Sequence, residues 1–106
     1  MQNKMQNKMQ EIELRILGIK KELQEIDLMR TGTLTEQYKN PKEQTGGYYQ
    51  LSYTHEMKSR TDYIRKPFKD DIKNEVKNYN KFKELCTEWV NLSIKYSKLR
   101  HVSESS

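Results

Sequence analysis

The sequence predicts an α+β fold with a long N-terminal helix, a small antiparallel sheet and a long C-terminal helix. Apolar residues recur every three or four positions in residues 1–30 and again in 67–101, which is a helical period. Tyr, Thr and Ile alternate with polar residues over 48–65, which is the period of strands. Hydrophobic residues make up only 33% of the 106 residues, against about 45–50% in typical globular domains. We therefore expect one small domain with apolar seams along its helices and no thick core.

Residues 1–30 have the pattern of a coiled-coil-like helix. Spacings of three and four alternate over about three heptads, and the seam consists of Met9, Ile12, Ile16, Ile19, Leu23 and Ile26. Gly32 just beyond tolerates the left-handed conformation of a helix end, so the helix is predicted to end near Arg30. We expect this helix to pack antiparallel to the C-terminal helix, and leftover apolar surface on the seam favours a homodimer through the same six residues.

Residues 31–66 are predicted to form the small antiparallel sheet. Residues 48–53 and 61–65 have the composition of a hairpin, and residues 33–38 are a candidate third strand. The connecting segment HEMKS contains neither Gly nor Asn, which favours a loop of several residues over a two-residue turn. An isolated hairpin is marginally stable in water, so the sheet must recruit the third strand or pack on a helix.

The hairpin is rich in tyrosines that fall on both of its faces. Tyr49 and Tyr53 lie on one side of its first strand and Tyr48 lies on the other. Both faces cannot pack against the same helix, so at least one or two rings should be exposed.

Residues 67–101 are predicted to form the C-terminal helix, and residues 102–106 a disordered tail. Pro67 suits a first helical position, and Asp70 and Asp71 favour the positive end of the helix dipole. An apolar and aromatic stripe at helical spacing then runs from Ile72 to beyond Tyr96.

The charge pattern favours an anionic partner. The net charge is +5, and the basic excess is spread along the chain instead of forming a tail, so plain solubility explains it equally well. In the hairpin, however, cations that reach phosphates are interleaved with rings that stack on bases. On the C-terminal helix, lysines repeat every four residues. The favoured interpretation of this repeat is a solvated face, and the alternative is a stripe of cations that contacts phosphates. The candidate nucleic-acid-binding residues are Tyr48, Tyr53, Lys58, Arg60, Tyr63, Arg65, Lys66, Lys69 and Lys73.

The sequence favours a protein that is not an enzyme and that needs no cofactor or metal. It has two histidines, His55 and His101, and no glycine-rich phosphate loop or paired-ligand spacing. Cys86 is the single cysteine, which excludes an internal disulfide and suits a reducing compartment. The first residues lack the apolar stretch of a signal peptide, and no run approaches the length of a membrane span. We therefore expect a cytoplasmic protein without membrane contact.

Three segments, GTLTEQY, GGYYQLSYTHEMKSRTDYIRK and NYNKFKELCTEWVNLSIKYSKL, in this order resemble a family of small prokaryotic proteins often found with transposons and other mobile elements. Gly32-Thr33-Leu34 is similar to its Gly-Ser-Leu start, Gly47-Tyr48-Tyr49 to its Gly-Pro-Tyr-Tyr strand, and residues 80–85 to its N-R-R-L-like helix segment. The cysteine knuckle of that family is replaced here by KNPKEQTGG, so zinc binding is not expected. The resemblance implies a mobile-element or phage origin and action near nucleic acid.

Three functions remain open on the sequence. The leading one is a nucleic-acid-binding accessory protein that uses the basic, Tyr-rich hairpin, for DNA or RNA. The second is a protein-interaction module, such as a phage or mobile-element inhibitor that occupies another protein's nucleic-acid-binding groove. The third is a structural coiled-coil adaptor.

Overall fold

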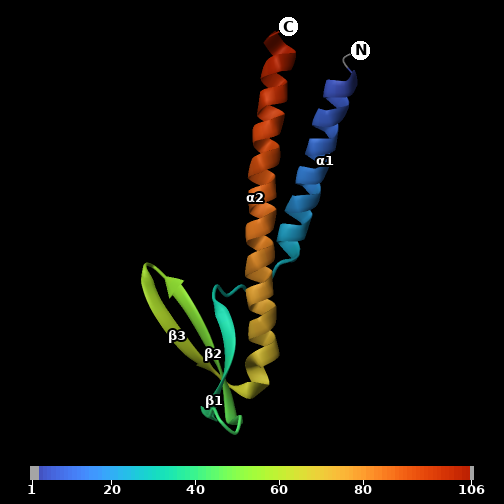
Figure 1. Cartoon of the computed structure of the whole chain (residues 1–106). Helices are drawn as coiled ribbons and strands as arrows, with labels where there is room; N and C mark the ends of the chain where they lie inside the picture. The colour runs from blue at the N-terminus through green and yellow to red at the C-terminus, as the bar shows by residue number, and fades with distance from the viewer. Residues whose placement is uncertain (1–2, 106) are drawn as a thin grey trace. The chain divides into compact units, whose positions relative to one another are not determined.

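The computed structural model describes the backbone of residues 3–105 and the side chains of residues 4–102 (Figure 1). In chain order the elements are α1 (Asn3–Glu25), β1 (Thr33–Asn40), β2 (Thr45–His55), β3 (Lys58–Ile64), a short 3-10 helix (Lys66–Phe68) and α2 (Lys69–Ser105). The predicted α+β fold is confirmed. The chain divides into two compact units, a helical unit of residues 1–26 and 81–106 and a sheet unit of residues 27–80.

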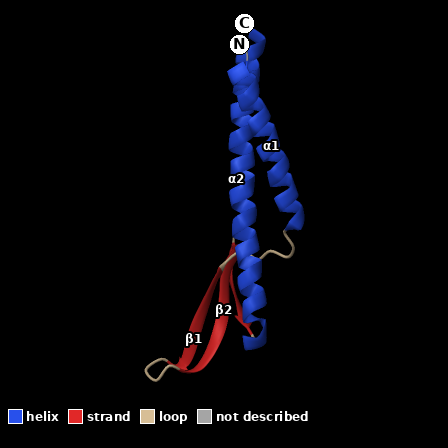
Figure 2. Ribbon diagram, turned by 90° about the vertical axis from the view of Figure 1, so that its right-hand side faces the viewer, coloured by secondary structure: helices blue, strands red, loops and turns tan. Residues whose placement is uncertain are grey.

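In the helical unit, α1 and the C-terminal part of α2 lie side by side and antiparallel (Figures 1 and 2). The polar contacts follow this order, because the Tyr96 hydroxyl donates to Glu13 Oε1 over 2.5 Å while Lys81 Nζ lies 4.0 Å from Glu22 Oε1. Ile19 is fully buried between the helices. The buried apolar residues of this unit are Ile12, Ile19 and Leu85.

The predicted apolar seam of α1 is therefore the surface that α2 covers. Ile12 and Ile19 are buried, and the other seam residues, Met9, Ile16, Leu23 and Ile26, are half-buried. The antiparallel helix packing expected from the sequence is confirmed. A homodimer through this same seam stays a prediction, and it would compete with α2 for the same side chains.

In the sheet unit, the three strands are antiparallel in the order β1-β2-β3. Residues 33–38 thus belong to a third strand, as predicted. One face of the sheet packs against the first turns of α2, where Leu51, Ile64 and Ile72 form a buried cluster. Leu34, Tyr49, Tyr53 and Val76 pack around this cluster. We call this side of the sheet the covered face and the opposite side the open face.

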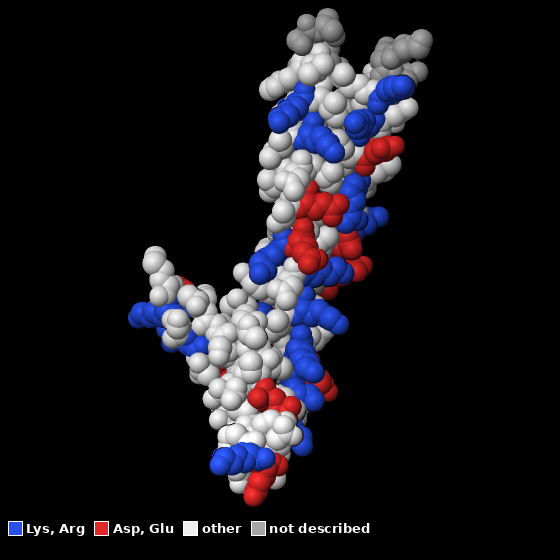
Figure 3. Space-filling view, in the orientation of Figure 1, with Lys and Arg blue, Asp and Glu red and all other residues white. Residues whose placement is uncertain are grey.

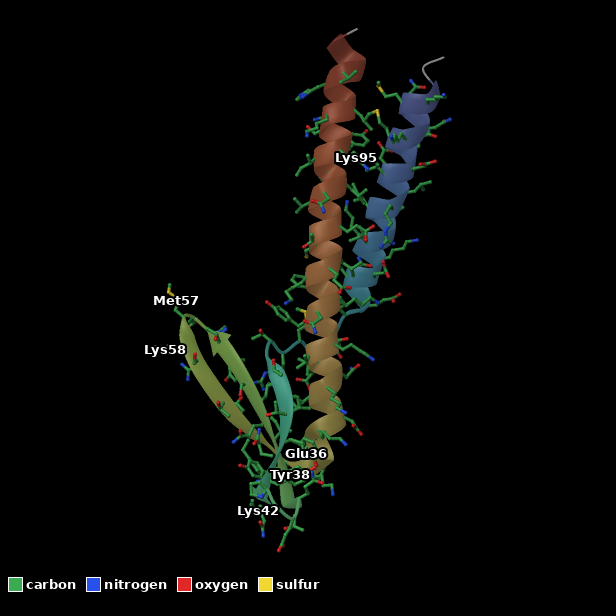
Figure 4. The ribbon with its side chains drawn as sticks, viewed as in Figure 1. Glu36, Tyr38, Lys42, Met57, Lys58 and Lys95 are labelled. Atoms are coloured by element: carbon green, nitrogen blue, oxygen red, sulfur yellow. The ribbon has the colours of Figure 1, made fainter. Side chains whose placement is uncertain are left out.

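The β2–β3 connection is a two-residue turn, so the predicted loop of several residues is wrong. His55 pairs directly with Lys58, which leaves only Glu56 and Met57 in the turn. Both turn residues have left-handed backbone conformations, with φ of 51° and 65°. Such a turn normally carries Asn-Gly because L side chains are strained there. Met57, 98% exposed, marks the tip of the hairpin (Figure 4).

The N-terminal helix ends at Glu25, five residues before the predicted end. The segment that follows is held by the sheet unit: Arg30 N donates to Glu75 O over 3.0 Å, and Asn78 Nδ2 donates to Leu28 O over 3.0 Å. The Arg30 guanidinium also pairs with Asp62 at 2.7 Å. These tertiary contacts outweigh the helical pattern of the local sequence.

The C-terminal helix departs from the prediction at both ends. Pro67 lies in the 3-10 helix that precedes α2, and Asp70 and Asp71 occupy the first turn of α2, where their charges favour the helix N-terminus. At the other end α2 continues to Ser105, so residues 102–105 are helical and the predicted tail starts too early. Residue 106 lies outside the described residues.

Candidate nucleic-acid interface

The open face of the sheet is built from four rows of side chains that the strand register fixes. Cross-strand partners point to the same face, and residues alternate along each strand. Because Leu34, Leu51 and Ile64 lie on the covered face, their neighbours in sequence lie on the open face. The paired open-face residues are Gln37 with Tyr48, Thr35 with Gln50 and Tyr63, Thr33 with Ser52 and Thr61, and Thr54 with Ser59.

Two tyrosines stand together in the middle of the open face. The ring centroids of Tyr48 and Tyr63 are 5.9 Å apart with an interplanar angle of 34°. Tyr63 is 66% exposed and Tyr48 is half-buried. The exposed ring expected from the sequence is therefore present. Gln37 and Gln50, the cross-strand neighbours of these tyrosines, add amide donors and acceptors beside the rings.

Two cations lie at one end of the open face. Arg65 follows Ile64 in an extended conformation, so alternation places it on the face of Tyr63. Lys39 follows Tyr38 on β1, and its Cβ lies opposite Gly46, again on the open face. Lys39 is missing from the sequence-based candidates because the predicted strand ended at residue 38. The longer β1 gives it a defined position.

Three other candidates, Lys58, Arg60 and Tyr53, lie on the covered face. Arg60 pairs across from Tyr53, and Lys58 pairs with His55 at the hairpin tip. The ring of Tyr53 is already in contact with a cation, because the Arg30 guanidinium carbon lies 4.9 Å from its centroid. Its hydroxyl also lies 3.5 Å from Asp62 Oδ1, so Tyr53 holds the covered face together and is not open to a base. The predicted site thus divides over two faces.

The remaining candidates lie in the 3-10 helix and α2. Lys66 is exposed in the 3-10 helix. Lys69 Nζ lies 5.3 Å from the centroid of the Tyr49 ring and 4.0 Å from Asp70 Oδ1, so its charge is partly compensated. Lys73 is exposed beside Lys77 on the outer side of α2.

Charged atoms are unevenly distributed over the sheet unit. Figure 3 shows basic groups at the tip of the β2–β3 hairpin and both signs of charge near the β1–β2 turn, with largely uncharged atoms between them. Lys42 lies in the β1–β2 turn, and Lys58 lies beside Met57 at the hairpin tip (Figure 4). On the covered face, the Glu36 carboxylate raises the pKa of Tyr38 through its negative charge.

Two further findings concern sites of other kinds. Among the side chains that the structure describes, no group of three or more His, Cys, Asp and Glu residues is placed to hold a metal ion. Neither described helix combines the length and the apolar content that crossing a membrane requires.

The comparisons with known proteins give a family without an assigned function. Residues 9–74 match the family model described as a domain of unknown function, DUF6788. No curated protein and no solved structure matches the chain. The association with transposons and mobile elements that the sequence resemblance implies therefore stays a prediction. The match includes α1 from residue 9 onward, the whole sheet and α2 up to residue 74, which is more than half of the chain. The chain thus belongs to the DUF6788 family.

Proposed function

We propose that the protein binds single-stranded nucleic acid through the open face of its sheet, as an accessory protein and not as an enzyme. The observation that carries this proposal is the Tyr48–Tyr63 ring pair on the open face, in which Tyr63 is 66% exposed and which lies near Arg65 and Lys39. Exposed aromatic rings accept unpaired bases by stacking, and this works for every base because each has a π-face. A duplex hides its base faces, so the platform suits a single strand.

The chemistry of the face divides into three parts. Tyr48 and Tyr63 provide the stacking surface, and Gln37 and Gln50 provide hydrogen-bonding groups for base edges. Arg65 and Lys39 would neutralise phosphates at one end of the row, which releases counterions and makes affinity fall as salt rises. The hydroxyls at the other end, on Thr33, Ser52 and Thr61, would contact sugar or phosphate oxygens without charge.

The test compares two matched pairs of variants in binding to a fluorescent single-stranded oligonucleotide. Tyr63→Ala should weaken binding by about 1–3 kcal/mol, because a stacked base loses its partner, whereas Tyr63→Phe should retain most of the affinity. Arg65→Ala should reduce the slope of log affinity against log salt by about 0.7 for one lost phosphate contact. Arg60→Ala, which removes another exposed arginine, on the covered face, should leave that slope nearly unchanged.

The outcomes distinguish binding on the open face from binding at the whole hairpin and from a protein-interaction function. Equal losses for Arg60→Ala and Arg65→Ala would place binding at the hairpin as a whole and not on the open face. No binding to single-stranded DNA or RNA at low salt would remove the proposal and favour the protein-interaction module. DNA and RNA oligonucleotides of the same sequence should be compared, because the 2′-hydroxyl is the group that can distinguish them.

The proposal includes the cellular setting. A reducing cytoplasm suits a chain whose single cysteine, Cys86, is unpaired with any other cysteine. The mobile-element or phage origin that the sequence resemblance implies is part of the same proposal.

A further inference from the structure

The outer side of α2 in the helical unit carries an apolar stripe that α1 does not cover. Val90 and Ile94 are 58% and 50% exposed, although they lie in the middle of a 37-residue helix. They border an open hollow of about 650 Å3 on the surface of α2. The hollow exists because several of the neighbouring side chains, Cys86, Ser93 and Ser97, are small. The hollow is lined by Cys86, Trp89, Val90, Ser93, Ile94, Ser97, Lys98 and His101.

The stripe continues the existing contact between α1 and α2. Trp89 belongs to both, because Lys20 Nζ of α1 lies 5.4 Å from its ring centroid and Trp89 also lines the hollow. Ser93 and Ser97 also belong to both, since they line a second hollow with Ile16 and Glu13 of α1. An added helix seated on the stripe would therefore extend the helix packing that is already present.

A two-helix unit has little interior of its own. Its buried apolar residues are Ile12, Ile19 and Leu85, because two helices can share only one seam. Bundles of four helices enclose a core from several sides and bury the flanks of each seam as well. The exposed stripe on α2 is such a flank.

We propose that a second copy of the chain covers this stripe, with the two α2 helices antiparallel across a two-fold axis near Ser93 and Ile94. A two-fold interface uses the same surface on both subunits, so the stripe must be complementary to itself. Centred between these two residues, the antiparallel arrangement sets Val90 opposite the second copy's Ser97. It likewise sets Ile94 opposite the second copy's Ser93, so each large side chain faces a small one.

The charges favour the antiparallel orientation over the parallel one. A parallel pair would set Lys98 against the second copy's Lys98 and Val90 against its Val90, which combines like charges with crowding. The antiparallel pair instead sets Lys98 opposite the second copy's Trp89, which carries no charge, so the two lysines are kept apart. The stripe from Cys86 to His101 is about 22 Å long. Such a short contact predicts an association that depends on protein concentration.

The first test measures the oligomeric state of the full chain by sedimentation equilibrium. Ile94→Glu should raise the dimer dissociation constant by about 100-fold or more, because a symmetric dimer carries the buried charge twice and each copy should cost at least about tenfold. Leu14→Glu is the matched control, since Leu14 is 69% exposed on α1, two positions from the buried Ile12 and thus away from α2. It should leave the dissociation constant unchanged, and circular dichroism checks that both variants keep their helices.

The second test detects the register by a disulfide. Antiparallel pairing sets Cys86 opposite position 101 of the second copy, so His101→Cys should give covalent dimers on mild oxidation. Positions 86 and 101 of one helix are about 22 Å apart, which is too far for a disulfide within a chain. The control Cys86→Ser/His101→Cys lacks the partner thiol and should remain largely uncrosslinked.

Both tests can overturn the proposal. A chain that is monomeric at all accessible concentrations and that gives no 86–101 disulfide would refute it. Equal dissociation by Ile94→Glu and Leu14→Glu would show that the copies meet elsewhere. Covalent dimers of the unsubstituted chain through Cys86 alone would exclude the antiparallel register, because the two Cys86 residues would then lie together.

Discussion

Replacing Leu51 by Ala tests whether the sheet unit depends on the small cluster between the covered face and α2. Leu51 is fully buried at the centre of β2, between Leu34 of β1 and Asp62 of β3, and its side chain reaches Ile72 of α2. Losing three side-chain carbons costs about 2–2.5 kcal/mol in transfer free energy alone. The cavity left behind raises the expected loss to about 3–4 kcal/mol, because strands bonded on both sides collapse poorly.

The loss is large compared with the stability that a chain of this size can have. A domain of about a hundred residues is stable by roughly 5–15 kcal/mol, so Leu51→Ala should remove a substantial fraction of it. The assay is urea denaturation followed by circular dichroism, with Leu28→Ala as control. Leu28 is 69% exposed, so that variant should change the free energy of unfolding by less than about 0.5 kcal/mol. A loss below about 1 kcal/mol for Leu51→Ala would refute the packing of β2 on α2.

Three further predictions concern the turn, one ion pair and one glycine. Glu56→Asn with Met57→Gly should stabilise the hairpin by about 1 kcal/mol or more, measured by thermal unfolding, because both positions are left-handed. The hydrogen bond from Arg15 lowers the pKa of Glu88 below the ordinary value of 4.5. The folded state therefore gains stability from this carboxylate above that ordinary value and loses it as the pH falls through the lowered pKa. Glu88→Gln should make stability less dependent on pH in that acid range, followed by urea denaturation at several pH values. Gly32→Ala should lower the melting temperature, because φ is 127° there and the new Cβ would lie 2.6 Å from a backbone oxygen of β2.

The sequence was sufficient for the elements because their periods are local properties. The heptad spacing of α1 predicted the seam, and α2 covers Ile12 and Ile19 as expected. The end of α1 was not predictable from the same pattern. Arg30 leaves the helix for contacts with Glu75 and Asp62, which are more than thirty residues away in the sequence. Long-range contacts of this kind leave no periodic signal in the chain.

The division of the candidate site over two faces depends on the length of one turn. A loop of unspecified length leaves the register of β3 open, and a slip by one residue moves every side chain of a strand to the other face. The two-residue turn at Glu56 and Met57 fixes the register, and with it Arg60 faces the same side as Tyr53. Because neither turn residue is Gly or Asn, the usual signal for this turn was missing.

The composition of the open face supports the proposed recognition. Exposed strand positions that only keep a protein soluble commonly carry Lys or Glu, and charges there also prevent strands from pairing with other chains. On the central strand β2, the open-face residues are instead Tyr48, Gln50, Ser52 and Thr54, all uncharged and all able to hydrogen-bond. The exposed cations of the hairpin, Lys58 and Arg60, stand on the opposite face. Under the proposed function, the flat rings of nucleic-acid bases would stack on the two tyrosine rings, and their polar edges would meet the amides and hydroxyls beside them.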